Sequence, residues 1–148
     1  MALSEGRRYP PRKLTLDALI ATLIEEHVLM RGCIRRAREA AARKDFEKVR
    51  EELQKVDPVF RQHIADEEAQ ILGVLIREVG VKGAEQEIRV FQQHRPIYIL
   101  MKKASDLASK STAGLEASQA ELEDLFELHT KAEEERVFPR AGSLVKPA

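Results

Sequence analysis

The stretch FRQHIADEEAQ, residues 60–70, places a histidine, His63, four positions before a carboxylate, Glu67. Residues four apart lie on the same face of a helix, one turn from each other. The spacing returns in FELHTKAEEE, near the other end of the chain, where Glu133 follows His129. Two copies of one polar pair, each inside an amphipathic run, indicate two helices that present the same side chains on the same kind of face.

The whole chain reads as helical. Four segments carry helical periodicity, and none shows the alternating pattern of a strand, so the sequence predicts an all-α fold. Because the connections are short, neighbouring helices are expected to run antiparallel in an up-down-up-down four-helix bundle. The first two predicted helices run from a cap at Thr15 to about Arg43 and from a cap at Asp45 to Gly80. The third runs from the turn at Gly80 and Gly83 to about Ser109, and the fourth opens within the stretch STAGLEASQAELEDLF, residues 111–126, and closes at Pro139.

Prolines and one capping signal modify this pattern. Pro58 is expected to kink the second helix, or to restart it with Asp57 as the cap. Pro96 is expected to bend the third helix beside His94, because its ring nitrogen donates no hydrogen bond. Ser118 has a glutamate three residues later, at capping-box spacing, and is one candidate start of the fourth helix.

Length and composition limit the number of domains and the kinds of covalent or metal cross-link that the chain can contain. A chain of 148 residues is long enough for one domain with a substantial core. We expect a flexible N-terminal tail over residues 1–14, the bundle over 15–140 and a C-terminal tail over 141–148. The single cysteine, Cys33, permits no intramolecular disulfide and no cysteine-based metal site, and it fits a reducing compartment.

Charge and hydropathy indicate which classes of partner the chain is not expected to bind. Twenty-five basic side chains balance twenty-five acidic ones, and no helix carries a block of one sign, so nucleic acid is not an expected partner. No run approaches the roughly 20 apolar residues that a membrane span needs, and the N-terminal region lacks the apolar stretch of a signal peptide. We therefore expect no membrane association and a cytoplasmic location.

Each predicted helix carries one histidine on its apolar face, and counting from turns near residues 44, 81 and 112 places all four at a similar depth. A lone histidine on such a face is more often an ordinary core residue. Four facing imidazoles and two buried carboxylates, however, would each need a polar partner in a dry core, and a cation satisfies the whole set. The sequence predicts a metal site in the bundle core, formed by His27, His63, Glu67, His94, His129 and Glu133.

The neighbours and the ligand types refine this site. Large apolar residues stand one turn before the histidines, where they would form a wall that excludes water. Imidazole and carboxylate ligands without thiolate suit iron, manganese or zinc, and the number of ligands suits two ions better than one. Ferritin-like bundles use Glu-x-x-His instead, so that class is disfavoured. The predicted wall residues are Ile24, Phe60, Phe91 and Phe126.

The ordered ligands resemble the pattern of hemerythrin-like, or HHE cation-binding, domains: His27, then His63-x-x-x-Glu67, then His94, then His129-x-x-x-Glu133. The ending EEERVFPRA is similar to the characteristic Phe-Pro close of that family. The resemblance covers roughly residues 15–140. It implies two iron ions joined by an oxo, hydroxo or water bridge, with the first two histidines on one iron, the last two on the other, and both glutamates bridging.

Two departures from the family pattern leave alternatives open. Glu134 is the alternative to Glu133, because oxygen-carrying hemerythrins place this carboxylate five residues after the histidine. Those proteins also carry a second histidine on the third helix, at the position of Tyr98. Tyr98 would coordinate the metal, hydrogen-bond a bound water or small ligand, or leave a coordination position open. An open position favours reactivity over oxygen storage. In this respect the chain is similar to di-iron proteins implicated in iron–sulfur-cluster repair.

The resemblance implies a non-haem di-iron protein that binds or senses a small diatomic ligand or peroxide (O2, NO or H2O2), or that handles iron. Manganese or zinc in the same ligands is the alternative metal content. We expect a binding protein rather than an enzyme, and no catalytic residue is assigned. The alternatives are a di-iron oxidase, peroxidase or iron–sulfur-cluster repair factor, and a metal-free helical interaction module.

Overall fold

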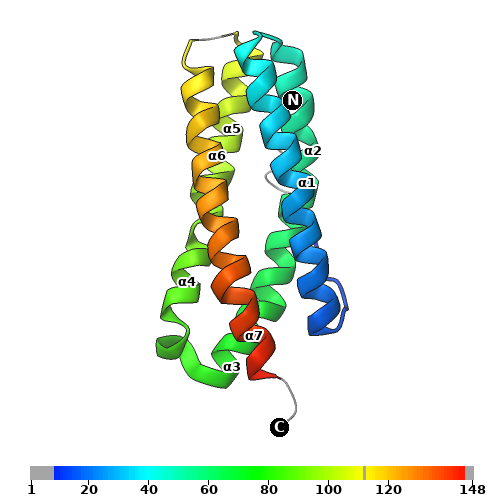
Figure 1. The fold of residues 1–148 in the computed structure, drawn as a ribbon, viewed down its shortest axis with the longest axis vertical. Coiled ribbons are helices and arrows are strands. Elements are labelled where there is room, and N and C mark those ends of the chain that lie inside the picture. The colour runs from blue at the N-terminus through cyan, green and yellow to red at the C-terminus, as the bar shows by residue number, and fades with distance from the viewer. Residues whose placement is uncertain (1–8, 112, 146–148) are drawn as a thin grey trace.

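The computed structural model describes residues 9–111 and 113–145, and over these residues it is all-helical, with no strand. The all-α prediction is confirmed. The helical segments form four long columns that lie side by side (Figure 1). In chain order the columns are α1 (Leu16–Ala42); α2 (Phe46–Asp66), η1 (Glu67–Ile71) and α3 (Leu72–Gly83); α4 (Glu85–Gln92) and α5 (His94–Ser109); and α6 (Leu115–Ala132), η2 (Glu133–Val137) and α7 (Phe138–Leu144).

The core between the columns is split into two apolar clusters. Helix α1 packs against α2 and α6, and α5 packs against the same two helices. One cluster includes Met30 of α1 and Phe60 of α2, and the other includes Leu23 of α1 and Ile71 of η1. His27 lies between the two clusters along α1, and a histidine occupies the same place in each other column. The four histidines therefore form a polar layer inside an otherwise apolar interior.

The capping predictions at the first two helices are confirmed. The side chains of Thr15 and Asp45 each accept a hydrogen bond from a backbone amide in the first turn of their helix, both at 3.2 Å. Helix α2 continues without a break through Pro58, so the predicted restart with Asp57 as a cap is wrong. Asp57 instead pairs with Arg61, one turn later, at 3.0 Å. None of the helices described here is both long and apolar enough to cross a bilayer.

The third column is interrupted beside its histidine, as predicted. Helix α4 ends at Gln92 and α5 begins at His94, so that Gln93 alone separates the two. Pro96 provides the cause, because it has no N–H to donate to the carbonyl of residue 92. The interruption places the Gln93 side chain next to the polar layer, where it contacts a histidine of the fourth column.

The fourth column departs from prediction at both ends. Helix α6 begins at Leu115, after Gly114 and within the predicted opening stretch, and Ser118 is buried inside the helix, so the candidate start at Ser118 is wrong. Pro139 does not end the column either. It lies in the first turn of α7, directly after the π turn η2, and the helix continues to Leu144, past the predicted boundary at residue 140. Residues 146–148 of the predicted C-terminal tail lie outside the described residues.

A single π-helical turn follows each of the two His-x-x-x-Glu pairs, η1 beginning at Glu67 and η2 at Glu133. Such turns often occur at functional sites. The wider turn also changes which residues face inward. A regular heptad places Val74 inward, but Leu75 is the fully buried residue and Val74 is half-buried. The sequence periodicity did not reveal either π turn.

Gly80 kinks the second column near its end, in a backbone conformation that other residues avoid, with φ 74° and ψ 172°. We expect Gly80→Ala to lower the free energy of unfolding by about 1–3 kcal/mol, because this region of φ/ψ space is nearly restricted to glycine. Gly73→Ala is the matched control. It lies within α3 with nothing inside 4 Å of an added Cβ, so it is expected to raise stability by up to about 1 kcal/mol. Urea unfolding midpoints measure both effects, and changes of equal sign would contradict the prediction.

Candidate metal centre

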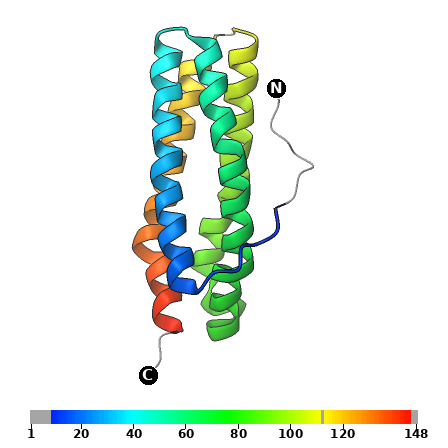
Figure 2. The same ribbon diagram turned by 90° about the vertical axis from the view of Figure 1, so that its right-hand side faces the viewer.

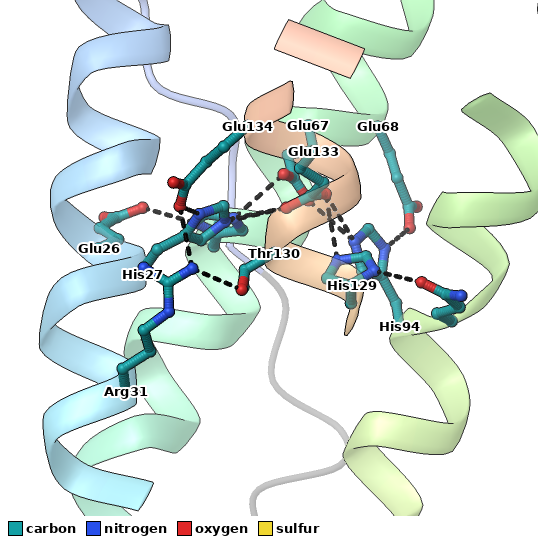
Figure 3. A network of polar contacts seen from close by, with 12 residues as sticks. Glu26, His27, Arg31, Glu67, Glu68, His94, His129, Thr130, Glu133 and Glu134 are labelled. Atoms are coloured by element: carbon teal, nitrogen blue, oxygen red, sulfur yellow. Dashed lines mark hydrogen bonds and ion pairs between the residues drawn. The ribbon is translucent and has the colours of Figure 1, made fainter. Parts of the chain in front are cut away.

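Six side chains from the four columns meet in the polar layer (Figure 3). They form two groups of four ligand atoms, and the atoms of each group lie within 4.8 Å of one another. We call these groups the His27/His63 position and the His94/His129 position, and Glu67 and Glu133 belong to both. Each of the six residues is at most 5 % exposed. The structure thus brings together the six residues that the sequence singled out as metal ligands.

The two shared glutamates each direct one oxygen to each position. The Oε2 atom of Glu67 lies 3.1 Å from Nε2 of His63, while its Oε1 atom lies 2.8 Å from Nε2 of His94. In the same way, Oε1 of Glu133 lies 2.9 Å from Nε2 of His27, and its Oε2 lies 3.1 Å from the fourth histidine. A carboxylate held in this orientation can bind two cations at once, one through each oxygen.

Several of these buried atoms have no hydrogen-bond partner of acceptable geometry among the described residues, in spite of the short contacts. An unsatisfied buried polar atom costs about 1–3 kcal/mol, more when it is charged, and such atoms are rare in folded proteins. A cation between the ligands would satisfy all of them, so the donor set fits a bound metal. The atoms are both carboxylate oxygens of Glu67, Oε2 of Glu133, and Nε2 of His94 and His129.

Other buried carboxylates of the chain are neutralised by basic side chains. Burial acts to raise the pKa of Glu52, but its contacts with Arg36, Lys48 and Lys55 outweigh burial and lower that pKa to about 2. The buried Asp66 side chain likewise pairs with an arginine. The ion-pair partners of the two shared glutamates are instead histidines. The carboxylates of the polar layer therefore pair with histidines, whereas Glu52 and Asp66 pair with arginine or lysine.

The pKa shifts in the polar layer favour protons on His63 and His94 beside an ionised Glu133. Burial lowers the pKa of His63 and of His94, but the surrounding carboxylates outweigh it and hold both pKa values well above the ordinary value. Burial raises the pKa of Glu133, but its contacts with Glu67 and with the histidines hold that pKa well below its usual range. A metal ion would take the place of these protons, so binding would release them.

Each histidine directs Nε2 to the centre and is held at Nδ1 by an outer partner. A hydrogen bond from Nδ1–H fixes the tautomer and the ring orientation, which is the usual arrangement around histidine ligands of metals. The outer partners are Glu134 on His27 at 2.6 Å, Glu26 on His63 at 3.0 Å, Glu68 on His94 at 3.3 Å and Gln93 on His129 at 3.0 Å. Glu134, the alternative ligand from the sequence, thus lies outside the two groups of four, on the far side of a histidine ring.

Two arginines balance the outer carboxylates around the His27/His63 position. Arg31 lies 3.4 Å from Glu134, and Arg12 lies 2.9 Å from Glu26. Arg12 also donates from its backbone N and its Nε to Asp66, both at 2.7 Å. Arg12 falls within the tail predicted to be flexible, yet Figure 2 shows this segment running from α1 across to the column of α2. Residues 1–8 of that tail lie outside the described residues.

Aromatic rings surround the histidines, and three of them were predicted. Phe91 stacks on His94 with ring centroids 5.4 Å apart, and Phe60 meets the same ring edge-on at 6.0 Å. Phe126 meets His27 edge-on at 6.5 Å. These rings exclude bulk water from the layer and strengthen electrostatic interactions within it.

The wall on the α1 side differs from prediction. Ile24 is 37 % exposed, and Leu23 is fully buried in its place, so Ile24 is not a wall residue. Both positions lie about one turn before His27, and the packing of α1 against α2 and α6 decides which one faces inward. Phe138 stacks on His27 at 5.8 Å and was missed, although it belongs to the Phe-Pro pair that the sequence displayed.

Tyr98 makes a contact that the sequence did not indicate. Its hydroxyl accepts a hydrogen bond from Arg61 of α2 at 2.9 Å, and the Arg61 guanidinium lies 5.1 Å from the centre of its ring. Arg61 is held in turn by Asp57. The phenol thus contributes to an interaction between α2 and α5, and its predicted role toward a bound metal stays a prediction.

The chain was compared with models of known protein families, with curated protein sequences and with solved structures, and none of them matched. The resemblance to hemerythrin-like domains therefore stays a prediction that depends on six residues, their order and the Phe-Pro close. What the arrangement itself offers is four imidazoles and two carboxylates, buried in one layer and able to hold metal ions.

Proposed function

We propose that the chain is a hemerythrin-like, non-haem di-iron protein that binds or senses O2, NO or H2O2, or that handles iron. The observation that carries the proposal is the sharing of Glu67 and Glu133 between two groups of buried ligands. Sharing of this kind favours a pair of ions over a single one. Histidine and carboxylate without thiolate are ligand types that suit iron, and they also suit manganese and zinc.

The proposal includes an up-down-up-down bundle with the metal pair in its core. Contacts between α1 and the fourth column support antiparallel packing, because residue numbers rise along one as they fall along the other. The contacts in question are Arg38 with Glu123, Arg31 with Glu127 and His27 with Glu134. This topology brings one histidine from each column to the same level.

The residues around the pair have distinct roles in the proposal. The four histidines hold the ions, two at each position, and the two shared glutamates span both positions. A pair of iron ions supplies redox and ligand-binding chemistry toward small oxygen and nitrogen species. The outer partners keep the imidazole rings oriented, and Phe60, Phe91 and Phe126 keep bulk water away from the ligands.

Metal analysis of the purified protein tests the proposal. We expect two irons per chain in protein purified without added metal, and a visible absorption band that changes when anaerobic protein is exposed to air. Zinc or manganese would support the site but contradict iron-based binding of oxygen or nitric oxide. A stably folded protein without metal would contradict the proposal and favour a helical interaction module with four core histidines.

A further inference from the structure

The two metal positions have unequal outer partners. At the His27/His63 position both imidazoles donate from Nδ1–H to a carboxylate, His27 to Glu134 at 2.6 Å and His63 to Glu26 at 3.0 Å. A carboxylate that accepts this hydrogen bond increases the electron density on the imidazole and makes its other nitrogen a stronger ligand. Both histidine ligands of this position are therefore strengthened.

These two carboxylates are sheltered and held in place. The Glu134 side chain is 28 % exposed and pairs with Arg31, and the Glu26 side chain is 14 % exposed and pairs with Arg12. Low exposure reduces the screening of a carboxylate by water, so its effect on the imidazole is retained. The arginines limit the movement of both carboxylates away from the rings.

The His94/His129 position has weaker outer partners. The Nδ1–H group of His129 donates to the neutral amide oxygen of Gln93 at 3.0 Å, which polarises the ring less than a carboxylate does. The partner of His94 is Glu68, whose side chain is 52 % exposed and lies 3.3 Å away. The His94 side chain is also 6 % exposed, against at most 2 % for the other three histidines.

We propose that the two ions are held with unequal strength and that the His94/His129 position is the exchangeable one, with metal entering and leaving at the edge marked by Glu68. The inference rests on the proposed function and adds a property to that site. In this inference Gln93 is a positioning residue, whose side-chain amide acts on the metal through His129. Replacing an outer partner of a histidine ligand typically changes metal affinity by about 10–100-fold, which is enough to separate two otherwise similar positions.

Release of iron(II) into a chromogenic chelator tests the inference. Protein loaded anaerobically with two ions is expected to release them in two phases of equal amplitude, with rates that differ by about 10-fold or more. Gln93→Glu gives His129 a carboxylate partner and is expected to slow the fast phase about 10-fold. Gln92→Glu is the matched control, because it adds the same charge on the adjacent, exposed residue, and both phases should keep their rates.

A second variant tests the His27/His63 position, which is expected to release its ion slowly. Glu134→Gln removes the carboxylate partner of His27 and is expected to accelerate the slow phase while the fast phase is unchanged. Release of both ions in one phase from the wild-type protein would overturn the inference. The inference would also be overturned if Gln93→Glu changed the rate of the slow phase alone. An effect of Gln92→Glu as large as that of Gln93→Glu would overturn it as well. A protein that binds no iron contradicts the proposed function itself, whereas two ions released together contradict only their inequality.

Discussion

A Glu133→Gln protein is expected to lose both metal ions, so that iron falls from two per chain to fewer than one. The reason is that Glu133 belongs to both groups of ligands, with Oε1 beside His27 and Oε2 beside His129. Glutamine keeps the size of the side chain but offers one weak oxygen ligand and an NH2 group, which is a donor and cannot bind a cation. Elemental analysis after anaerobic loading and desalting measures the change.

Glu135→Gln is the control for this experiment. Glu135 lies in the same π turn, its side chain is 62 % exposed, and its ion-pair contact is with Lys131 at 4.0 Å. The control protein should keep both ions, because it loses the same charge at almost the same place in the sequence. Glu133→Gln protein that retains both ions would contradict a bridging role. Retention of one ion would assign Glu133 to a single position.

The grouping of the six buried side chains could be predicted from the sequence because helical periodicity is simple. A histidine on the apolar face of each of four helices, at a countable distance from each turn, must meet the others once the helices pack antiparallel. Glu67 and Glu133 follow from the same rule, since four residues correspond to about one turn. These inferences need only the helical repeat and the approximate turn positions, and an error of one or two residues at a helix end does not change them.

The details that escaped prediction depend on the rotation of each helix about its own axis. Residues three and four before a histidine are both one turn away, so the sequence could not decide between Ile24 and Leu23. The π turns escaped as well, because a single wider turn leaves the helical repeat on either side of it almost unchanged. The outer partners Glu26 and Gln93 lie in other columns than the histidines they hold. Glu68 and Glu134 could have been suspected, since each directly follows a predicted ligand.

Removing the metal is expected to lower the stability of the fold substantially. The polar layer divides the apolar core, and its buried oxygens and nitrogens would lose the cation that satisfies them. Metal that binds only the folded state adds about 4 kcal/mol when its free concentration is 1,000 times Kd, and this corresponds to a fall in Tm of about 10 °C on removal for a chain of this size. Thermal unfolding of anaerobic iron-loaded and chelator-treated protein measures the difference.

The Glu133→Gln protein again provides the control, because a chain that binds no metal should unfold at the same temperature with and without chelator. A wild-type protein whose Tm is also unchanged by chelator would behave as a metal-free helical module. The buried carboxylates of the layer would then depend on protonated imidazoles for their charge balance. The raised pKa values of His63 and His94 indicate that the metal-free layer is held together in that way. Such a layer requires protonated imidazoles, so metal-free protein is expected to lose stability as the pH rises through these pKa values, whereas metal-loaded protein keeps its charge balance there.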